Sequence, residues 1–247
     1  MRTAVPLVGA LLVLTVAGCG PGVPPPPTSA PEPSASPPLS EQLGVTCGEG
    51  PAFRPSLLEQ TGHAETDPDP AAGALRAEIA TGGGTIPPTG WIRVAQTADR
   101  VQFVAPSPGG ATWWVVGLMV GDGAWVLDLA GECRPQVAAP AGSSLAGWWL
   151  DPAFPRPAPE ARTINVVLVE SACASGSPPV GRVLGPVISS TPTELRIVLF
   201  VRQRPGAQDC QGNPEFPMEI ELSEPLGARA LLDAGVFPPR DASRPPG

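Results

Sequence analysis

The placement of proline most limits how this chain can fold, because its 36 prolines are densest in three segments. Residues 20–40 include an uninterrupted run from Pro24 to Pro27, residues 152–159 read PAFPRPAP, and the chain ends in FPPRDASRPPG. Segments of this composition bury no core and favour extended polyproline II. The pattern therefore predicts a tether, a first folded half at 43–151, a second at 152–236 and a disordered tail at 237–247.

The first half predicts short helices followed by an antiparallel meander. Asp69 is placed to cap a helix that begins at Pro70 and ends at the glycines 82–84. Short β-prone segments follow at 91–96 and 100–105, and the nearly all-apolar run 111–120 predicts a central strand buried on both faces. A tight turn at 121–123 then leads into the alternating residues Trp125, Leu127 and Leu129.

The second half predicts strands at residues 163–171, at 194–203 and around 218–222. In the second of these, Leu195, Ile197, Leu199 and Val201 lie on one face. Turns rich in Gly, Pro and Ser separate the strands at a spacing typical of sandwiches. The expected fold is therefore α+β and predominantly β: an antiparallel meander with two or three short helices, followed by a small β-sandwich-like half.

The N-terminal residues predict export. Arg2 precedes an apolar run at 4–16, which is shorter than the roughly 20 residues of a membrane-spanning helix. The run ends in Val16-Ala17-Gly18-Cys19, which resembles the lipobox of bacterial lipoproteins. The resemblance implies a signal peptide at 1–18, cleavage before Cys19, and a diacylglyceryl group on the Cys19 thiol. An ordinary secretory signal with an incidental cysteine is the alternative.

A lipid on Cys19 would anchor the chain to the extracytoplasmic face of the cell membrane. Its two acyl chains would hold the protein durably in the lipid bilayer. The Pro-rich tether at 19–42 would then separate the folded part from the membrane by ~60 Å, at about 3.1 Å per residue.

Besides Cys19, the chain has four cysteines: Cys47, Cys133, Cys173 and Cys210. In an exported domain an even number predicts two disulfides. Of the three possible pairings we favour Cys47–Cys133 and Cys173–Cys210, because each pair lies within one half. Structural zinc sites bring ligands in closely spaced pairs, which these cysteines do not form, so no metal site is expected.

Residues 165–236 contain three segments that resemble an uncharacterised exported domain of high-GC Gram-positive bacteria. They read ESACASG (170–176), CQGNP (210–214) and EPLGARALLD (224–233). The resemblance implies a fold unit and a disulfide, without an assigned activity. If the third segment is helical, Arg229 and Asp233 are four residues apart and would pair.

The sequence offers no complete catalytic set. A serine hydrolase needs a general base, usually histidine, beside its nucleophile. The sequence has a single histidine, His63, and contains no G-x-S-x-G motif that would present a serine nucleophile. Glu219 and Glu221 could act as glycosidase carboxylates, but a solvated strand face explains them. No glycine-rich nucleotide motif is present, so no cofactor is expected, and the net charge of −8 disfavours binding to nucleic acid.

Two tryptophan pairs are the binding candidates: Trp113-Trp114 and Trp148-Trp149. Adjacent strand residues point to opposite faces, so one member of each pair could fill the core while the other stacks on a sugar or anchors a protein partner. The alternative is that both members of each pair are buried between the two halves.

These features predict a membrane-anchored lipoprotein that is a non-enzymatic binding or structural module of the cell envelope. Its partner would be an unidentified envelope protein or glycan. A carboxylate-dependent envelope hydrolase and an accessory or sensor subunit of an envelope complex are the alternatives.

Overall fold

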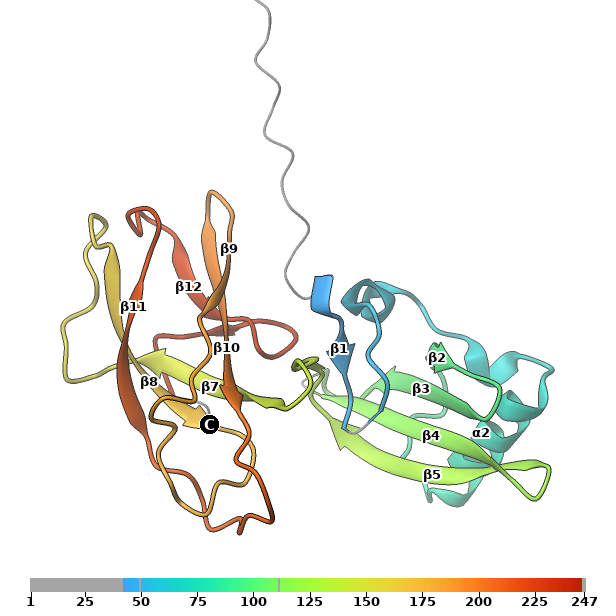
Figure 1. The fold of residues 1–247 in the computed structure, drawn as a ribbon. Coiled ribbons are helices and arrows are strands. Elements are labelled where there is room, and N and C mark those ends of the chain that lie inside the picture. Colours follow the sequence, from blue (N-terminus) through green and yellow to red (C-terminus); the bar gives the residue numbers. More distant parts are fainter. Residues whose placement is uncertain (1–41, 49, 111, 246–247) are drawn as a thin grey trace, which may run out of the picture. The chain divides into compact units, whose positions relative to one another are not determined.

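The computed structural model describes residues 42–48, 50–110 and 112–245 (Figure 1). Cys19, the predicted signal peptide and nearly all of the predicted tether lie outside these residues. The described part is α+β and predominantly β, as the sequence predicts. Within it, no helix combines the length and apolarity needed to cross a membrane.

The first half is built from short helices, a two-stranded antiparallel sheet of β1 and β6, and a four-stranded antiparallel sheet. Its strands β2 to β5 pair in chain order, which confirms the predicted meander (Figure 1). The elements are β1 (Val45–Thr46), the 3-10 helices η1 (Pro55–Glu59) and η2 (Ala64–Thr66), α2 (Pro70–Thr81), β2 (Ile92–Gln96), β3 (Arg100–Pro106), β4 (Trp113–Gly121), β5 (Ala124–Cys133) and β6 (Gln136–Val137).

Helix α2 begins where the sequence predicts. The Asp69 carboxylate accepts hydrogen bonds from the backbone N–H groups of Ala71 (3.0 Å) and Ala72 (3.2 Å), and Pro70 occupies the first turn. Leu75 is fully buried against the sheet. The cap and the apolar contact together fix the helix on one face of the meander.

Each face of the meander has its own core, because residues along β3 and β4 alternate in direction. The face under α2 packs Trp91, Val101, Phe103, Val116 and Leu118. The opposite face packs under a cover segment, defined here as residues 45–48 and 50–60, which contains β1 and η1. Its core comprises Val45, Phe53, Leu58, Ile92, Val94, Val104 and Val115.

Strand β5 departs from the predicted alternation. Gly117 pairs with Leu129, and Leu118 pairs with Leu127, so Asp128 is the extra residue of a β-bulge. Leu129 consequently packs in the core under the cover segment, whereas Leu127 is 44% exposed. The bulge separates two residues that a strict alternation would place on one face.

The second half forms one mixed sheet of seven strands with the order β11-β8-β7-β10-β12-β13 and β9 beside β10. Strand β10 is parallel to β12 and antiparallel to β7 and β9. The strands are β7 (Ser143–Leu150), β8 (Thr163–Glu170), β9 (Val187–Ser190), β10 (Glu194–Arg202), β11 (Phe216–Glu221), β12 (Ala230–Asp233) and β13 (Arg240–Asp241).

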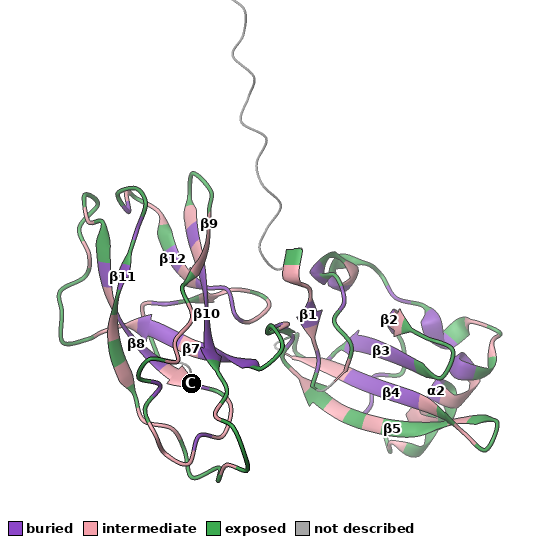
Figure 2. Ribbon diagram, viewed as in Figure 1, coloured by how far each residue is buried: buried purple, intermediate pink, exposed green. Residues whose placement is uncertain are grey.

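Strand β10 joins two wings of this sheet. Its first residues pair with β9 and β12, and its last residues pair with β7. Figure 2 shows long buried stretches along β7 and β10. The predicted face of β10 is confirmed, because one core cluster contains all four of its residues, Leu195, Ile197, Leu199 and Val201.

The structure differs from the predicted boundaries at two places. The predicted boundary assigns residues 143–150 to the first half, but they form strand β7, which pairs with β8 and β10 of the second sheet. The Pro-rich segment 152–159 is therefore a loop inside the second half. The predicted disordered tail contains β13, and Ala242 is fully buried. Arg240 donates to the Asp233 carboxylate (2.9 Å), which gives this charged segment a buried partner.

Candidate functional site

Two disulfides brace the described chain: Cys47–Cys133 and Cys173–Cys210, with Cα–Cα distances of 5.6 Å and 4.6 Å. This is the pairing that the sequence favours. The first bond ties the cover segment to the end of β5. The second closes the region between β8 and β11.

The tryptophan pairs form no flat exposed surface. Trp148 is fully buried and its indole N–H donates to the Ile197 carbonyl (3.1 Å), while Trp149 is 6% exposed. Trp113 and Trp114 are half-buried and pack against opposite faces of the meander. The predicted alternation is present, but most of each indole contributes to a core.

A pocket of about 690 Å³ lies on the meander face that carries the cover segment. We term it the sheet pocket. It is lined by Gly50, Pro51, Ala52, Val94, Ala95, Gln96, Thr97, Arg100, Val101, Gln102, Gly117, Leu118, Asp128 and Leu129.

Strand register explains the floor of the sheet pocket. Ala95 pairs with Gln102, Gln102 with Gly117, and Gly117 with Leu129, so these four residues form one row across the sheet. The Leu129 side chain packs over Gly117, because a Cβ at position 117 would lie only 2.9 Å from Cγ of Leu129. The small side chain of Ala95 on the other side of Gln102 adds little height to the row.

Gln102 is the polar centre of the sheet pocket. Its side chain is buried, and its Nε2 group donates to the Cys47 carbonyl (3.2 Å). Its Oε1 atom is buried without a hydrogen-bond partner among the described residues. Leaving a buried acceptor unpaired costs about 1–3 kcal/mol, so this atom favours the arrival of a donor.

The edges of the sheet pocket are set by a glycine and an ion pair. A Cβ at Gly50 would lie 2.2 Å from Nε2 of Gln102, so glycine lets the cover segment pass close to the amide without displacing it. At the opposite edge, Arg100 donates to the Asp128 carboxylate (2.9 Å), and its side chain is largely exposed.

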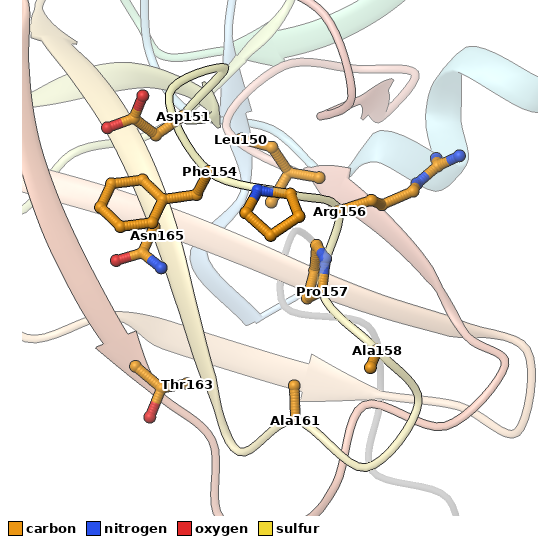
Figure 3. Close-up of a pocket in the computed structure, with 10 residues that line it drawn as sticks. Leu150, Asp151, Phe154, Arg156, Pro157, Ala158, Ala161, Thr163 and Asn165 are labelled. Carbon is orange, nitrogen blue, oxygen red and sulfur yellow. The ribbon is translucent and has the colours of Figure 1, made fainter.

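A second pocket of about 300 Å³, termed the loop pocket, lies in the second half (Figure 3). The loop between β7 and β8 and the start of β8 form it. Figure 3 shows the Phe154 ring beside the side chains of Asp151 and Asn165, with Arg156 pointing away from them. It is lined by Leu150, Asp151, Phe154, Pro155, Arg156, Pro157, Ala158, Ala161, Thr163 and Asn165.

Two of the three segments that resemble an exported domain, at 170–176 and 210–214, make contacts that stabilise the fold. Arg182 forms two hydrogen bonds to the buried Glu170 carboxylate (2.8 and 2.6 Å). The Asn213 side-chain amide donates to the carbonyls of Glu170 (2.8 Å) and Ala172 (2.6 Å), which holds the disulfide loop against β8.

The expected pair of Arg229 and Asp233 does not form, because Ala230–Asp233 is strand β12 and not a helix. Arg229 instead pairs with Glu224, and Asp233 pairs with Arg240. Burial raises the pKa of the Asp233 carboxyl above its ordinary value, although Gly235 and Arg240 donate to it.

Carboxylates do not gather into a metal site in the part of the chain that the structure describes. Glu219 and Glu221 are exposed on β11, at one end of the strand order. Sequence reasoning missed Gln102 and Gly117, which resemble ordinary strand residues until the register aligns them. The sequence also predicted a domain boundary in the loop around Phe154, because a Pro-rich segment is typical of a linker and nothing in its composition indicates that it lines a pocket.

Comparison of the chain with protein-family models, with curated proteins and with solved structures finds no match. The functional assignment therefore rests on the residues and geometry of the two pockets.

Proposed function

We propose that this protein is a lipid-anchored binding module of the cell envelope, and that its sheet pocket receives a small, uncharged, largely apolar ligand with a hydrogen-bond donor. The observation that carries this proposal is that Gln102 lines the pocket while its Oε1 atom is buried without a hydrogen-bond partner among the described residues. A ligand O–H or N–H group is the complement that this acceptor requires.

The lining of the sheet pocket supports this ligand class. Small-molecule sites occupy roughly 300–1,000 Å³ and combine apolar walls with a few placed polar groups. Val94 and Leu129, which pack on the face under the cover segment, supply apolar surface, and Gln102 supplies the acceptor. Because Arg100 and Asp128 neutralise each other at the edge, neither charge selects an ionic ligand.

The sequence supports the anchoring part of the proposal. The lipobox-like segment ending at Cys19 and the Pro-rich tether would display the folded part on the extracytoplasmic face of the membrane. The two disulfides fit an oxidising compartment outside the cytoplasm.

The test uses a matched pair of probes, 4-ethylphenol and 4-ethylanisole, which differ in the presence of the O–H donor. The full-length chain is expressed in its host, reconstituted in lipid nanodiscs and titrated while the NMR signals of the pocket residues are followed. We expect the phenol to bind about fivefold more tightly than the ether, since one buried hydrogen bond contributes on the order of 1 kcal/mol.

The variant Gln102→Leu should remove this preference, whereas Gln136→Leu, an exposed position outside the pocket, should preserve it. If neither probe shifts the signals of the pocket residues, the sheet pocket is not a binding site. Equal binding of both probes to the wild type would show that Gln102 does not select for a donor.

A further inference from the structure

We infer that the loop pocket is a second binding site, and that it takes a neutral saccharide ring. This site lies in the second half and shares no residue with the sheet pocket, so it stands independently of the ligand proposed there. Three observations support the inference: an exposed aromatic ring, a set of unpaired polar side chains, and a loop held in place by hydrogen bonds.

The exposed ring is Phe154, whose side chain stands at the pocket with 51% of its surface accessible. One face of a pyranose ring presents mainly C–H groups, which carry a small positive charge. The face of an aromatic ring is negative, so the two surfaces attract and bury apolar area together. Phe154 therefore supplies a stacking platform of the right polarity.

The polar groups match sugar hydroxyls. Thr163 and Asn165 are two residues apart in β8, which places their side chains on the same face of the strand. Neither side chain makes a hydrogen bond to another of the described residues. The Asn165 amide and the Thr163 hydroxyl can each donate and accept, as sugar hydroxyls do.

Asp151 adds an acceptor and limits ligand charge. Its Oδ1 atom accepts from the Ala153 N–H (2.8 Å), and its carboxylate lies beside the Phe154 ring in Figure 3. A carboxylate accepts several hydrogen bonds at once, so it can also bind a sugar O–H. Arg156, the cationic lining residue, points away from Asp151, Phe154 and Asn165 in Figure 3, so the carboxylate is the charge beside the ring. This negative charge repels uronic acids and phosphorylated sugars, which points to a neutral saccharide.

The loop is organised before any ligand arrives. The Asp151 N–H donates to the Asn165 carbonyl (3.0 Å), and the Phe154 N–H donates to the Asp151 carbonyl (3.1 Å). Pro155 and Pro157 further restrict the backbone next to Phe154. Because the platform and the polar groups are held together, little conformational entropy is lost on binding.

A Pro-rich peptide is the competing ligand, because proline rings also stack on aromatic side chains. Grooves for such peptides are lined by aromatic side chains, whereas the loop pocket has one aromatic ring and three side chains suited to hydroxyls. The composition of the pocket therefore favours a saccharide.

The test is a titration of the isotope-labelled full-length chain in nanodiscs, followed by NMR. The probes are methyl β-D-glucopyranoside, methyl N-acetyl-β-D-glucosaminide and a peptide with the sequence of residues 24–38. We expect at least one glycoside to shift the side-chain amide signal of Asn165. The substitution Phe154→Ala should weaken that binding by about two- to twelvefold, since an aromatic contact contributes ~0.5–1.5 kcal/mol beyond area burial.

Val180→Ala is the matched control, because Val180 is 68% exposed in the same half and does not line the pocket. This variant should bind the glycoside as the wild type does. The inference is overturned if no glycoside shifts the Asn165 signal, if Phe154→Ala binds with unchanged affinity, or if only the Pro-rich peptide perturbs the pocket. Unchanged backbone spectra of both variants would show that they fold.

Discussion

Two aspartates show how the surroundings of a single residue set the sign of its contribution to stability. Arg93 donates a hydrogen bond to the Asp69 carboxylate, and the first backbone N–H groups of α2 donate to it as well. These hydrogen bonds lower the pKa of the carboxyl below 3.8. Asp233 is 2% exposed, and burial raises its pKa above 3.8 despite the contact with Arg240. One site favours the charged carboxylate and the other favours the neutral acid.

The two carboxyls should therefore give opposite pH dependences. Asp69 stabilises the folded state above pH 3.8, and this contribution is lost as the pH falls through its lowered pKa. The contribution of Asp233 is complete below pH 3.8 and is lost as the pH rises through its raised pKa. Urea unfolding followed by tryptophan fluorescence, on wild type, Asp69→Asn and Asp233→Asn, measures both dependences.

Asparagine is the informative substitution because it still caps a helix while removing the titration. The difference in unfolding free energy between wild type and Asp69→Asn should become smaller as the pH falls below 3.8. The difference between wild type and Asp233→Asn should instead fall as the pH rises above that value. Parallel pH profiles for the two variants would contradict these assignments.

A buried glycine gives a second prediction at the scale of one residue. A Cβ on Gly62 would lie 2.4 Å from the backbone carbonyl of Trp91, which cannot move aside as a flexible side chain can. Gly62→Ala should therefore destabilise the protein by about 1–3 kcal/mol. Gly131→Ala is the control, because a Cβ there meets nothing within 4 Å, and it should change stability by less than about 0.5 kcal/mol.

At the scale of elements, local signals were sufficient where one short segment decides the structure. Asp69 and Pro70 mark the start of α2, and the turn after β4 has positive φ at Asp122 (49°) and Gly123 (79°), as the Gly-Asp-Gly sequence predicts. The inward face of β10 was also readable from its alternation. These features depend on neighbours in sequence.

Features that depend on distant pairing could not be read from the sequence. The bulge at Asp128 arises from the register between β4 and β5, and the two wings of the second sheet depend on which strands pair with β10. The sheet pocket needs Gln102 and Gly117 in one row, which only the register of β3 and β4 provides. The sequence could not show how far the tryptophan pairs are buried, because residue type alone does not determine which part of an indole packs into a core.

The Cys47–Cys133 disulfide gives a prediction at this scale, because it joins the cover segment to β5 across 86 residues of sequence. Replacing both cysteines with serine should cost about 2–5 kcal/mol of unfolding free energy. It should also weaken phenol binding in the sheet pocket, because the Cys47 carbonyl that orients Gln102 is no longer fixed to the sheet. Urea unfolding and probe titration measure the two effects.

The second disulfide is the matched comparison. Removing Cys173–Cys210 should also reduce stability, but it should leave phenol affinity unchanged, since neither cysteine lines the sheet pocket. An equal loss of phenol affinity in both double variants would show that the cover segment does not depend on its own disulfide.

At the scale of the whole molecule, the proposed lipid and the folded part have separable tasks. The lipid on Cys19 would determine where the protein resides, and the pockets would determine what it binds. The Pro-rich tether predicted from the sequence would join these tasks, since a segment of its composition favours extended polyproline II. Changing the anchor should therefore alter location and leave binding intact.

Cys19→Ser provides the test of this separation. The wild type should sediment with membranes of its host and incorporate labelled palmitate, whereas the variant should do neither, because serine lacks the thiol that accepts the diacylglyceryl group. The variant should still prefer 4-ethylphenol to 4-ethylanisole, since all residues of the sheet pocket lie far along the chain from position 19. A variant that stays membrane-bound with palmitate attached would refute lipidation at Cys19. Loss of the phenol preference in a correctly folded variant would show that location and binding are coupled.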